Sequence, residues 1–276
     1  MLELGLPITF DESAYLAKRL DVNNGETMLD MFTGSGIYPI FAAEKAKHAV
    51  GVDLNPKAIN YSKFNAILND VEDKTEFLLG DMFQPVQGRR FDLVTANPPY
   101  VVVPPISTRT DAMHADSGVD GLDIPERFIS EVDDFLKPRG RVQMITGSVG
   151  NKQEPEIGFI KERYRAQQKE VELDYLHKHR IKLRTFLRRK FTNTTYYHVV
   201  ISPRVLEEWL NGLGEQGYTD YYFYLVTIRP ADQYRLTTKR HRFQIRKDYY
   251  LTTDLSEFTL GYISRLFLEY RRFLRQ

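Results

Sequence analysis

The 276-residue sequence contains no cysteine. This absence excludes disulfide bonds, cysteine nucleophiles and thiolate metal sites together. The six histidines show no ligand-like spacing, since His177 and His179 lie two residues apart, which suits neither one helix face nor a familiar zinc pattern. We therefore expect no metal site.

Long apolar runs are absent too. No stretch approaches eighteen consecutive apolar residues, so we expect no membrane span and no membrane partner. The N-terminus carries acids early and lacks a basic region followed by a long apolar run, which does not fit a signal peptide. The expected location is cytoplasmic. A hydrophobic fraction of 42% and an aromatic fraction of 13% are ordinary for a globular protein with a sizeable core.

In residues 1–150, short β-rich runs alternate with helical patterns. This alternation predicts an α/β fold, with βαβ units and a doubly wound, mostly parallel sheet that has helices on both faces. Asn55 suits a helix N-cap and Pro56 the first helical position. The helix that follows carries Ala58, Tyr61, Phe64 and Leu68 at the spacing of one face. The expected strands are 27–32, 49–53, 76–79, 91–96 and 141–146, and the expected helices are 13–20, 36–47, 56–69 and 125–136.

The second half of the chain has weaker patterns. We expect strands at 170–176 and 221–228 and helices at 154–169 and 205–213. Asp254 and Glu257 form a usable capping box before a final helix. Its stripe of large apolar residues is interpreted as core packing and consists of Phe258, Tyr262, Leu266, Tyr270 and Phe273.

A glycine turn follows the first expected strand, in the run Asp30-Met31-Phe32-Thr33-Gly34-Ser35-Gly36. Glycines here let the backbone turn tightly and approach a ligand closely, and the N-terminus of the next helix offers free N–H donors. Asp53 ends the second expected strand, which in a doubly wound sheet puts its carboxylate beside the turn, where it can accept both hydroxyls of a ribose. A glycine turn alone is also typical of a plain strand-to-helix connection.

These two features fit NAD as well as S-adenosylmethionine. The dinucleotide fingerprint, however, requires a third glycine where this sequence has Pro39, and its absence favours the sulfonium cofactor. Past the third strand, Asp81 could accept a hydrogen bond from an adenine amino group while Met82 packs against the ring. Gly80-Asp81-Met82 is also typical of an ordinary turn.

The run Asn97-Pro98-Pro99-Tyr100 directly follows the fourth expected strand. Two prolines can neither continue a central strand nor start a helix interior, and they fix an extended backbone without N–H groups of its own. The side-chain oxygen of Asn97 and the carbonyl of Pro98 are thereby free to accept both protons of a planar amino group. Tyr100 can stack on such a flat acceptor. Methyl transfer then depends on in-line geometry and a dry site more than on a strong base.

The span 30–100 resembles the class I methyltransferases that carry an Asn-Pro-Pro-Tyr motif. Within them it is most similar to the group that contains release-factor glutamine methyltransferases, ribosomal-RNA guanine methyltransferases and adenine amino-methyltransferases. The resemblance implies a seven-stranded sheet with a reversed final hairpin. We expect a methyltransferase domain at residues 1–229, with its motifs within 25–150, and a C-terminal extension at 230–276 that is helical at its end.

The resemblance also implies roles for single residues, with S-adenosylmethionine as the cofactor. The predicted catalytic residues are Asn97, Pro98, Pro99 and Tyr100, and the predicted cofactor-binding residues are Asp30, Phe32, Thr33, Gly34, Gly36, Asp53, Leu54, Asp81, Met82 and Asn97. The sequence departs from the family pattern in two ways. Phe32 replaces the first glycine of the commonest motif, and the helical substrate domain of release-factor enzymes is not expected before the fold.

Charge is unevenly spread along the chain. Residues 1–150 hold 22 acidic and 14 basic residues, whereas residues 151–276 hold 15 and 24. Basic segments at 178–190 and 239–247, the second with aromatic residues close by, are typical of single-stranded nucleic-acid binding. The same bases could instead neutralise the acidic first half. Residues 101–123, rich in Pro, Asp, Ser and Gly, predict a substrate loop or lid, or a series of simple turns.

The sequence thus predicts an S-adenosylmethionine-dependent N-methyltransferase that acts on a planar amino or amide nitrogen. The leading acceptor is a nucleobase amino group in RNA or DNA. A protein glutamine is the alternative, followed by a small-molecule amine and by a cofactor-binding module without catalysis. The intact motif at 97–100 argues against the last of these.

Overall fold

The computed structural model describes residues 10–104, 117–176, 181–192 and 202–240. Short 3-10 turns lie at Glu72–Lys74, Gln84–Val86 and Val132–Phe135. In chain order the helices and strands are α1 (Phe10–Ala17), β1 (Thr27–Met31), α2 (Ile37–Ala42), β2 (His48–Asp53), α3 (Pro56–Leu68), β3 (Thr75–Leu79), β4 (Phe91–Ala96), α4 (Asp123–Glu131), β5 (Leu136–Gly150), α5 (Gly158–Ala166), β6 (Lys169–Tyr175), β7 (Ile181–Lys182), α6 (Leu183–Thr192), α7 (Pro203–Glu215), β8 (Asp220–Pro230) and β9 (Arg235–Arg240).

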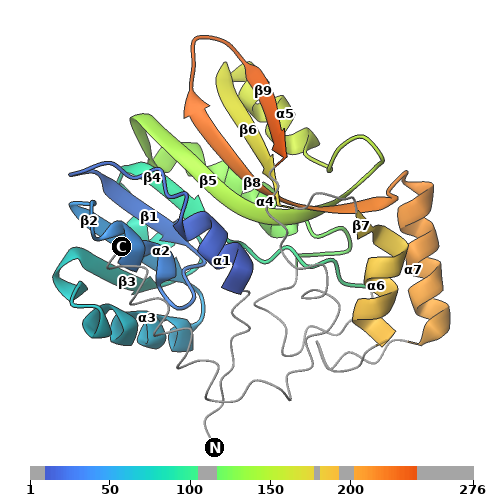
Figure 1. Cartoon of the computed structure of the whole chain (residues 1–276), viewed down its shortest axis with the longest axis horizontal. Coiled ribbons are helices and arrows are strands. Elements are labelled where there is room, and N and C mark those ends of the chain that lie inside the picture. The colour runs from blue at the N-terminus through green and yellow to red at the C-terminus, as the bar shows by residue number, and fades with distance from the viewer. Residues whose placement is uncertain (1–9, 105–116, 177–180, 193–201, 241–276) are drawn as a thin grey trace, which may run out of the picture.

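The described strands form one nine-stranded sheet in the order β3-β2-β1-β4-β5-β8-β6-β9, with β7 paired to β8 (Figure 1). The pairings from β3 through β5 are parallel, whereas β8 runs antiparallel to both β5 and β6. The predicted doubly wound, mostly parallel α/β fold is confirmed, and β8 is the reversed strand that the resemblance implied.

Two strands in the described part of the chain extend the sheet beyond the expected seven. The short β7 pairs with β8, and β9 pairs in parallel with β6. Because β9 lies within the region assigned to a C-terminal extension, that region begins as part of the sheet. The boundary between residues 229 and 230 stays a prediction, and the helix expected after Asp254 lies outside the described residues.

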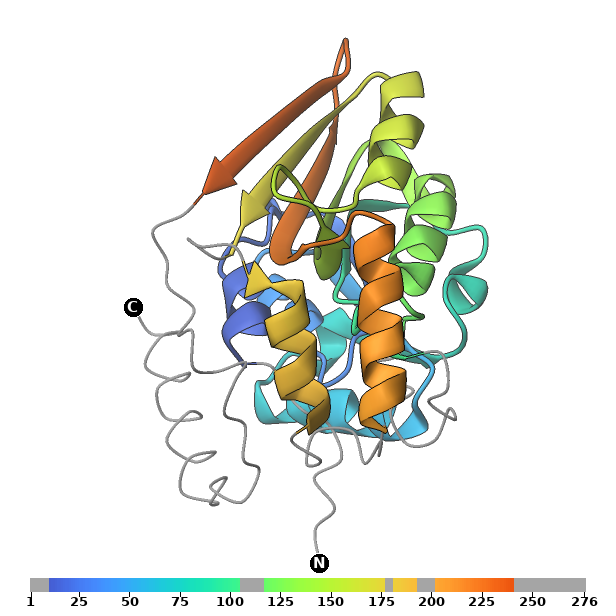
Figure 2. The ribbon, with the colours of Figure 1, turned by 90° about the vertical axis from the view of Figure 1, so that its right-hand side faces the viewer.

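Alternate side chains of the central strands enter two separate cores. Leu29 on β1 packs in a cluster with Phe128 of α4 and Tyr164 of α5. Its neighbour Met28 packs on the other face, in a cluster with Leu16 of α1 and residues of α6 and α7. Figure 2 shows α6 and α7 side by side, in agreement with the ion pairs between them. Within the described ranges, no helix has the length and apolar character needed to cross a membrane.

The start of α3 is as predicted, since the side chain of Asn55 accepts a hydrogen bond from the Lys57 N–H at 2.9 Å and Pro56 occupies the first turn. The apolar stripe was expected on the packed face, but Tyr61, Phe64 and Leu68 are exposed, Phe64 by 58%. The packed face instead consists of Ala58, Ile59, Ser62 and Ala66. Because α3 lies so close to α2 that a Cβ on Gly36 would be 2.8 Å from the Ser62 Cβ, only small side chains fit at this contact.

Candidate active site

The carboxyl ends of β3, β2, β1 and β4 meet at one edge of the sheet, and the predicted site residues follow these ends. Met31 pairs with Val52 and with Ala96, and Asp53 pairs with Leu79. The glycine turn, Asp53, the turn at 80–82 and the motif at 97–100 therefore leave the sheet side by side. This crevice outside the strand ends is where open α/β sheets bind ligands.

Asp53 is held by the backbone around it. Its Oδ2 accepts a hydrogen bond from the Gly34 N–H at 2.9 Å, and its Oδ1 accepts one from the Asn55 N–H at 2.8 Å. Burial raises the pKa of Asp53, and the backbone hydrogen bonds oppose that rise. The Leu54 N–H is a third backbone donor to this carboxylate, so about one of its four acceptor positions stays open.

The two glycines of the turn have different surroundings. At Gly34 (φ +54°) the nearest atom to an added Cβ would be the Phe32 carbonyl oxygen at 4.0 Å, so this position faces open space. At Gly36 a Cβ would meet Ser62 and the Phe77 ring, at 2.8 and 3.0 Å, so this glycine serves helix packing. Phe32 has φ +61°, a left-handed conformation that costs a non-glycine residue free energy, which explains why the commonest motif has glycine here.

Asp30 and Thr33 lie beneath the turn. Both are buried, Asp30 completely, and the Thr95 hydroxyl donates to Asp30 Oδ1 at 2.7 Å. Burial raises the pKa of Asp30 to about 7, and the nearby charge of Asp53 adds to the rise. Both side chains thus lie below the surface of the turn, and their predicted contact with the cofactor stays a prediction.

The turn after β3 places Met82 in the core, where it is buried with φ +48°. Its predicted packing against an adenine ring stays a prediction. The apolar side chains exposed beside Asp53 are those of Leu54, by 57%, and Leu79, by 55%. The cofactor role of Leu54 stays a prediction. Leu79 was not among the predicted residues, although it ends a strand just before Gly80.

The motif at 97–100 begins where β4 ends. Pro98 is buried, and Asn97, Pro99 and Tyr100 are half-buried. The Tyr221 hydroxyl on β8 donates to the Tyr100 carbonyl oxygen at 2.9 Å. The Tyr100 ring meets Phe223 edge-on, with ring centroids 5.9 Å apart and planes at 79°. The motif is thus fixed to β8, and stacking of Tyr100 on an acceptor stays a prediction.

The loop predicted at 101–123 returns beside its own start. The Val103 N–H donates to the Gly118 carbonyl at 3.0 Å, and the Ser117 N–H donates to the Val101 carbonyl at 3.4 Å. Both ends of the loop therefore lie next to the motif at 97–100. Its middle, residues 105–116, is outside the described residues, so its role as a lid stays a prediction.

Several bases of the predicted nucleic-acid segments pair with acids. Lys182 pairs with Asp220, and Arg184 and Arg188 both pair with Glu207 on α7, at 2.7 to 3.2 Å. In the second segment, Lys239 pairs with Glu172 at 2.6 Å. Residues 178–180 and 241–247 lie outside the described residues. These pairs favour the interpretation that the bases balance charge within the chain.

Comparison with known proteins identifies the family. A sequence model described as the TRM5/TYW2 methyltransferase domain matches residues 10–118. A protein of Methanocaldococcus jannaschii, provisionally named a protein N5-glutamine methyltransferase, is 37% identical over 148 residues, which make up 52% of this chain and 73% of that protein. The chain belongs to the class I S-adenosylmethionine-dependent methyltransferases.

Two other similar proteins cover less. The release factor glutamine methyltransferase of Thermodesulfovibrio yellowstonii is 31% identical over 139 residues, 47% of this chain and 50% of that one, so the match spans half of this relative's length. A crystal structure of the M. jannaschii tRNA m1G37 methyltransferase aligns with 81% of this chain and 49% of that one, at 18% identity and a TM-score of 0.47. A likeness this weak carries no argument about activity.

S-adenosylmethionine is the cofactor of this methyltransferase, and the residues at the sheet edge fit it. Open space at Gly34 allows close approach to the backbone. The open acceptor position of Asp53 suits a ribose hydroxyl, and the exposed side chains of Leu54 and Leu79 suit the flat adenine ring. Sequence reasoning missed three further residues at this edge: Thr95, Tyr221 and Arg127, of which the last pairs with Asp81.

Proposed function

We propose that this enzyme methylates the side-chain amide nitrogen of a glutamine in a protein. The observation that carries the proposal is the placement of Asn97 at the end of β4, next in register to the glycine turn, in a chain similar to enzymes named for glutamine methylation. The acceptor and the donor would then meet at adjacent strand ends. This differs from the nucleobase that the sequence alone put first.

The chemistry of an amide acceptor explains the need for Asn97 and Pro98. S-adenosylmethionine supplies an electrophilic methyl group. An amide nitrogen is a poor nucleophile because its lone pair is delocalised into the carbonyl. The Asn97 side-chain oxygen and the Pro98 carbonyl would accept its two N–H protons and so favour electron density on nitrogen. The methyl group would pass from sulfur to nitrogen, which would leave S-adenosylhomocysteine, and one of these N–H protons would be released to solvent.

Acidic side chains beside the acceptor motif support a protein substrate. Burial, together with the charges of Asp120, Asp123 and Glu156, raises the pKa of Glu126, so these four carboxylates lie near one another. Asp120 adjoins Gly121, where an added Cβ would lie 2.7 Å from the Tyr100 carbonyl oxygen. Negative charge here repels a phosphate backbone, attracts a basic peptide and does not repel a neutral one.

A nucleobase amino group in RNA or DNA is the second candidate. The sequence alone put it first, and the same two acceptors, the Asn97 side-chain oxygen and the Pro98 carbonyl, would serve a planar exocyclic amine. The pairing of Arg184 and Arg188 with Glu207 speaks against a free basic surface on α6. The cytoplasmic location stays a prediction in either case.

The test is transfer of labelled methyl from S-adenosylmethionine into unmethylated protein, RNA and DNA fractions in parallel. We expect label in protein, recovered as N5-methylglutamine after digestion. Asn97→Ala should lower turnover about 100-fold or more, as expected for removing a group that acts mainly in the transition state, while calorimetry gives unchanged cofactor affinity. Asn211→Ala on α7 is the control and should behave as wild type.

Label confined to nucleic acid would overturn the glutamine proposal and establish the second candidate. Normal turnover of Asn97→Ala would instead show that the acceptor site lies elsewhere. Loss of cofactor binding in Asn97→Ala would assign Asn97 to the cofactor alone.

A further inference from the structure

Arg127 on α4 holds the carboxylate of Asp81 at two points. Its Nη1 donates to Oδ1 at 3.0 Å and its Nη2 donates to Oδ2 at 2.9 Å. Its Nε donates to Glu131, one turn further along α4, at 3.0 Å. Three N–H groups of a planar guanidinium are thus fixed in direction, and they fix the plane of the Asp81 carboxylate.

The helix from which Arg127 extends is itself anchored in the core. Phe128, the next residue, is fully buried. Its ring stacks on Phe83, with centroids 5.8 Å apart and planes at 21°, and contacts Phe32 at 6.3 Å. Phe32 belongs to the glycine turn after β1. Two consecutive residues of α4 therefore contact both turns that flank the cofactor edge.

Folding stability does not explain the pair well. The side chains of Arg127 and Asp81 are about equally exposed, by 42% and 39%. Ion pairs with this much solvent contact contribute little to stability because water and salt screen them. A two-point contact, braced by a third bond to Glu131 and directed at a predicted cofactor residue, fits a role in positioning.

We propose that Arg127 is the positioning residue for the adenine end of S-adenosylmethionine. The two-point pair uses one acceptor position on each Asp81 oxygen, and about two of the four positions stay open. Arg127 thereby directs an open position of the Asp81 carboxylate toward the adenine amino group. The inference rests on the proposed cofactor role of Asp81 and is independent of which acceptor the enzyme methylates.

The test compares two ligands that differ at the amino group. Calorimetry gives the affinity of the full chain for S-adenosylhomocysteine and for its inosine counterpart, in which a carbonyl replaces the adenine amino group. Wild type should prefer the adenine form by about tenfold or more, as expected for a hydrogen bond to a charged group. Arg127→Met should lower this preference at least threefold by weakening the adenine form only, and Arg127→Lys should fall between.

Three further variants separate the possible failures. Glu131→Ala removes the neighbouring contact and keeps the pair with Asp81, so it should retain more of the preference than Arg127→Met. Asp81→Ala should abolish the preference. If it does not, Asp81 does not bind the adenine amino group, and the roles assigned to Asp81 and Arg127 both fail. If Asp81→Ala abolishes the preference but Arg127→Met leaves it at the wild-type value, only the positioning role is overturned. Arg204→Met on α7 controls for loss of an exposed arginine and should match wild type.

Discussion

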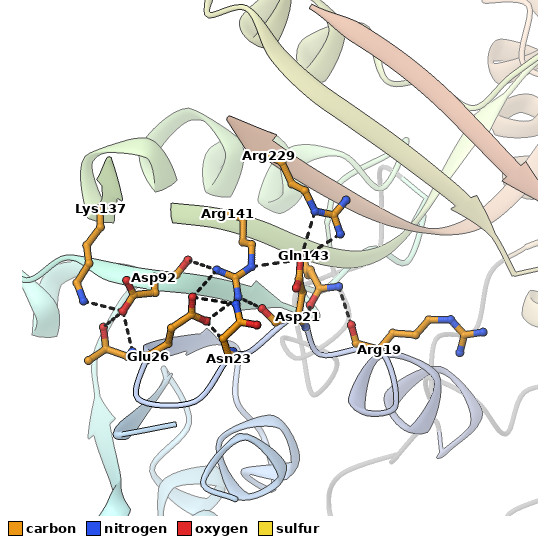
Figure 3. A network of polar contacts seen from close by, with 10 residues as sticks. Arg19, Asp21, Asn23, Glu26, Asp92, Lys137, Arg141, Gln143 and Arg229 are labelled. Carbon is orange, nitrogen blue, oxygen red and sulfur yellow. Dashed lines mark hydrogen bonds and ion pairs between the residues drawn. The ribbon is translucent and has the colours of Figure 1, made fainter. Parts of the chain in front are cut away.

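The two edges of the parallel sheet satisfy their polar groups in different ways. At the amino ends of β1, β4 and β5, charged side chains bind one another within the chain (Figure 3). At the carboxyl ends, Phe32 and Met82 adopt left-handed conformations, Leu54 and Leu79 are exposed, and the buried Asp30 has a raised pKa. Strain and exposed apolar surface of this kind concentrate where a ligand binds.

Arg141 is the centre of the amino-end edge. It donates to both oxygens of Glu26, at 3.0 and 2.6 Å, and to the carbonyls of Asp21 and Asp92. Asp21 also pairs with Arg229 of β8 at 3.1 Å. The segment between α1 and β1 is thereby tied to β4, β5 and β8. The amino-end edge thus fixes the fold, and this allows the carboxyl-end edge to carry unfavourable local structure.

The largest expected effect concerns the carboxyl edge and its buried Asp30. The folded protein holds the Asp30 proton up to about pH 7, whereas the ordinary pKa is 3.8. Between these two pH values the folded state therefore binds more protons at Asp30 than the unfolded state does. The contribution of Asp30 to the free energy of unfolding is fully present below pH 3.8 and is lost as the pH rises through 7. Since one pKa unit corresponds to about 1.4 kcal/mol, the loss is on the order of 4 kcal/mol.

Asp30→Asn should remove this dependence, because an amide does not titrate and can still accept from Thr95. Urea denaturation between pH 4 and pH 8 should show wild type losing stability relative to the variant. Asp70→Asn is the matched control, since Asp70 is exposed at the end of α3 with φ +56°, a conformation that asparagine tolerates. Parallel pH profiles for wild type and Asp30→Asn would mean that Asp30 is ionised in the fold.

A smaller effect is expected at the amino-end edge. Arg141→Met should lower the free energy of unfolding by about 2 kcal/mol, because Glu26 and Asp21 would lose a partner whose own side chain is only 9% exposed. Arg204 is the control, since its pair with Glu208 is 86% exposed on the arginine side, and Arg204→Met should change stability by less than about 0.5 kcal/mol.

The difference between the two edges also predicts that Arg141→Met does not change cofactor binding. Cofactor affinity of the folded variant should equal that of wild type, because the substitution lies at the opposite ends of the strands. If Arg141→Met had normal stability but weakened cofactor binding, the amino-end edge would serve cofactor binding and not stability, which would contradict the roles assigned to the two edges.

Local sequence patterns predicted the positions of the strands along the chain and the four turns that follow them at the carboxyl edge, because strand alternation, glycine turns and the cap at Asn55 act over a few residues. The contacts that join distant segments had no such signal. Arg127 pairs with Asp81 across 46 positions, and Tyr221 meets Tyr100 across 121. The prediction for the packed face of α3 failed for its large apolar residues. The close approach of α3 to the start of α2, where Ser62 lies against Gly36, admits only small side chains and outweighs the helical spacing of the large ones.

The smallest expected effect separates the two faces of one strand. Tyr221 and Tyr222 are neighbours on β8, both are buried, and each hydroxyl donates to a backbone carbonyl, that of Tyr100 at 2.9 Å and that of Asn151 at 2.6 Å. Replacing either by phenylalanine removes one hydrogen bond, so each variant should lose about 1 kcal/mol of stability. The stability effects of the pair are therefore matched.

Activity should distinguish the two variants. Tyr221→Phe frees the backbone of the acceptor motif from β8, and a slight misplacement of reacting groups lowers rate, so kcat/KM for the methyl acceptor should fall about threefold to tenfold at unchanged cofactor affinity. Tyr222→Phe should keep wild-type kinetics, because its hydroxyl contacts the turn after β5 and not the motif. Equal kinetics for the two variants would mean that the bond from Tyr221 holds the fold alone, and that the edge of β4 positions Asn97 without help from β8.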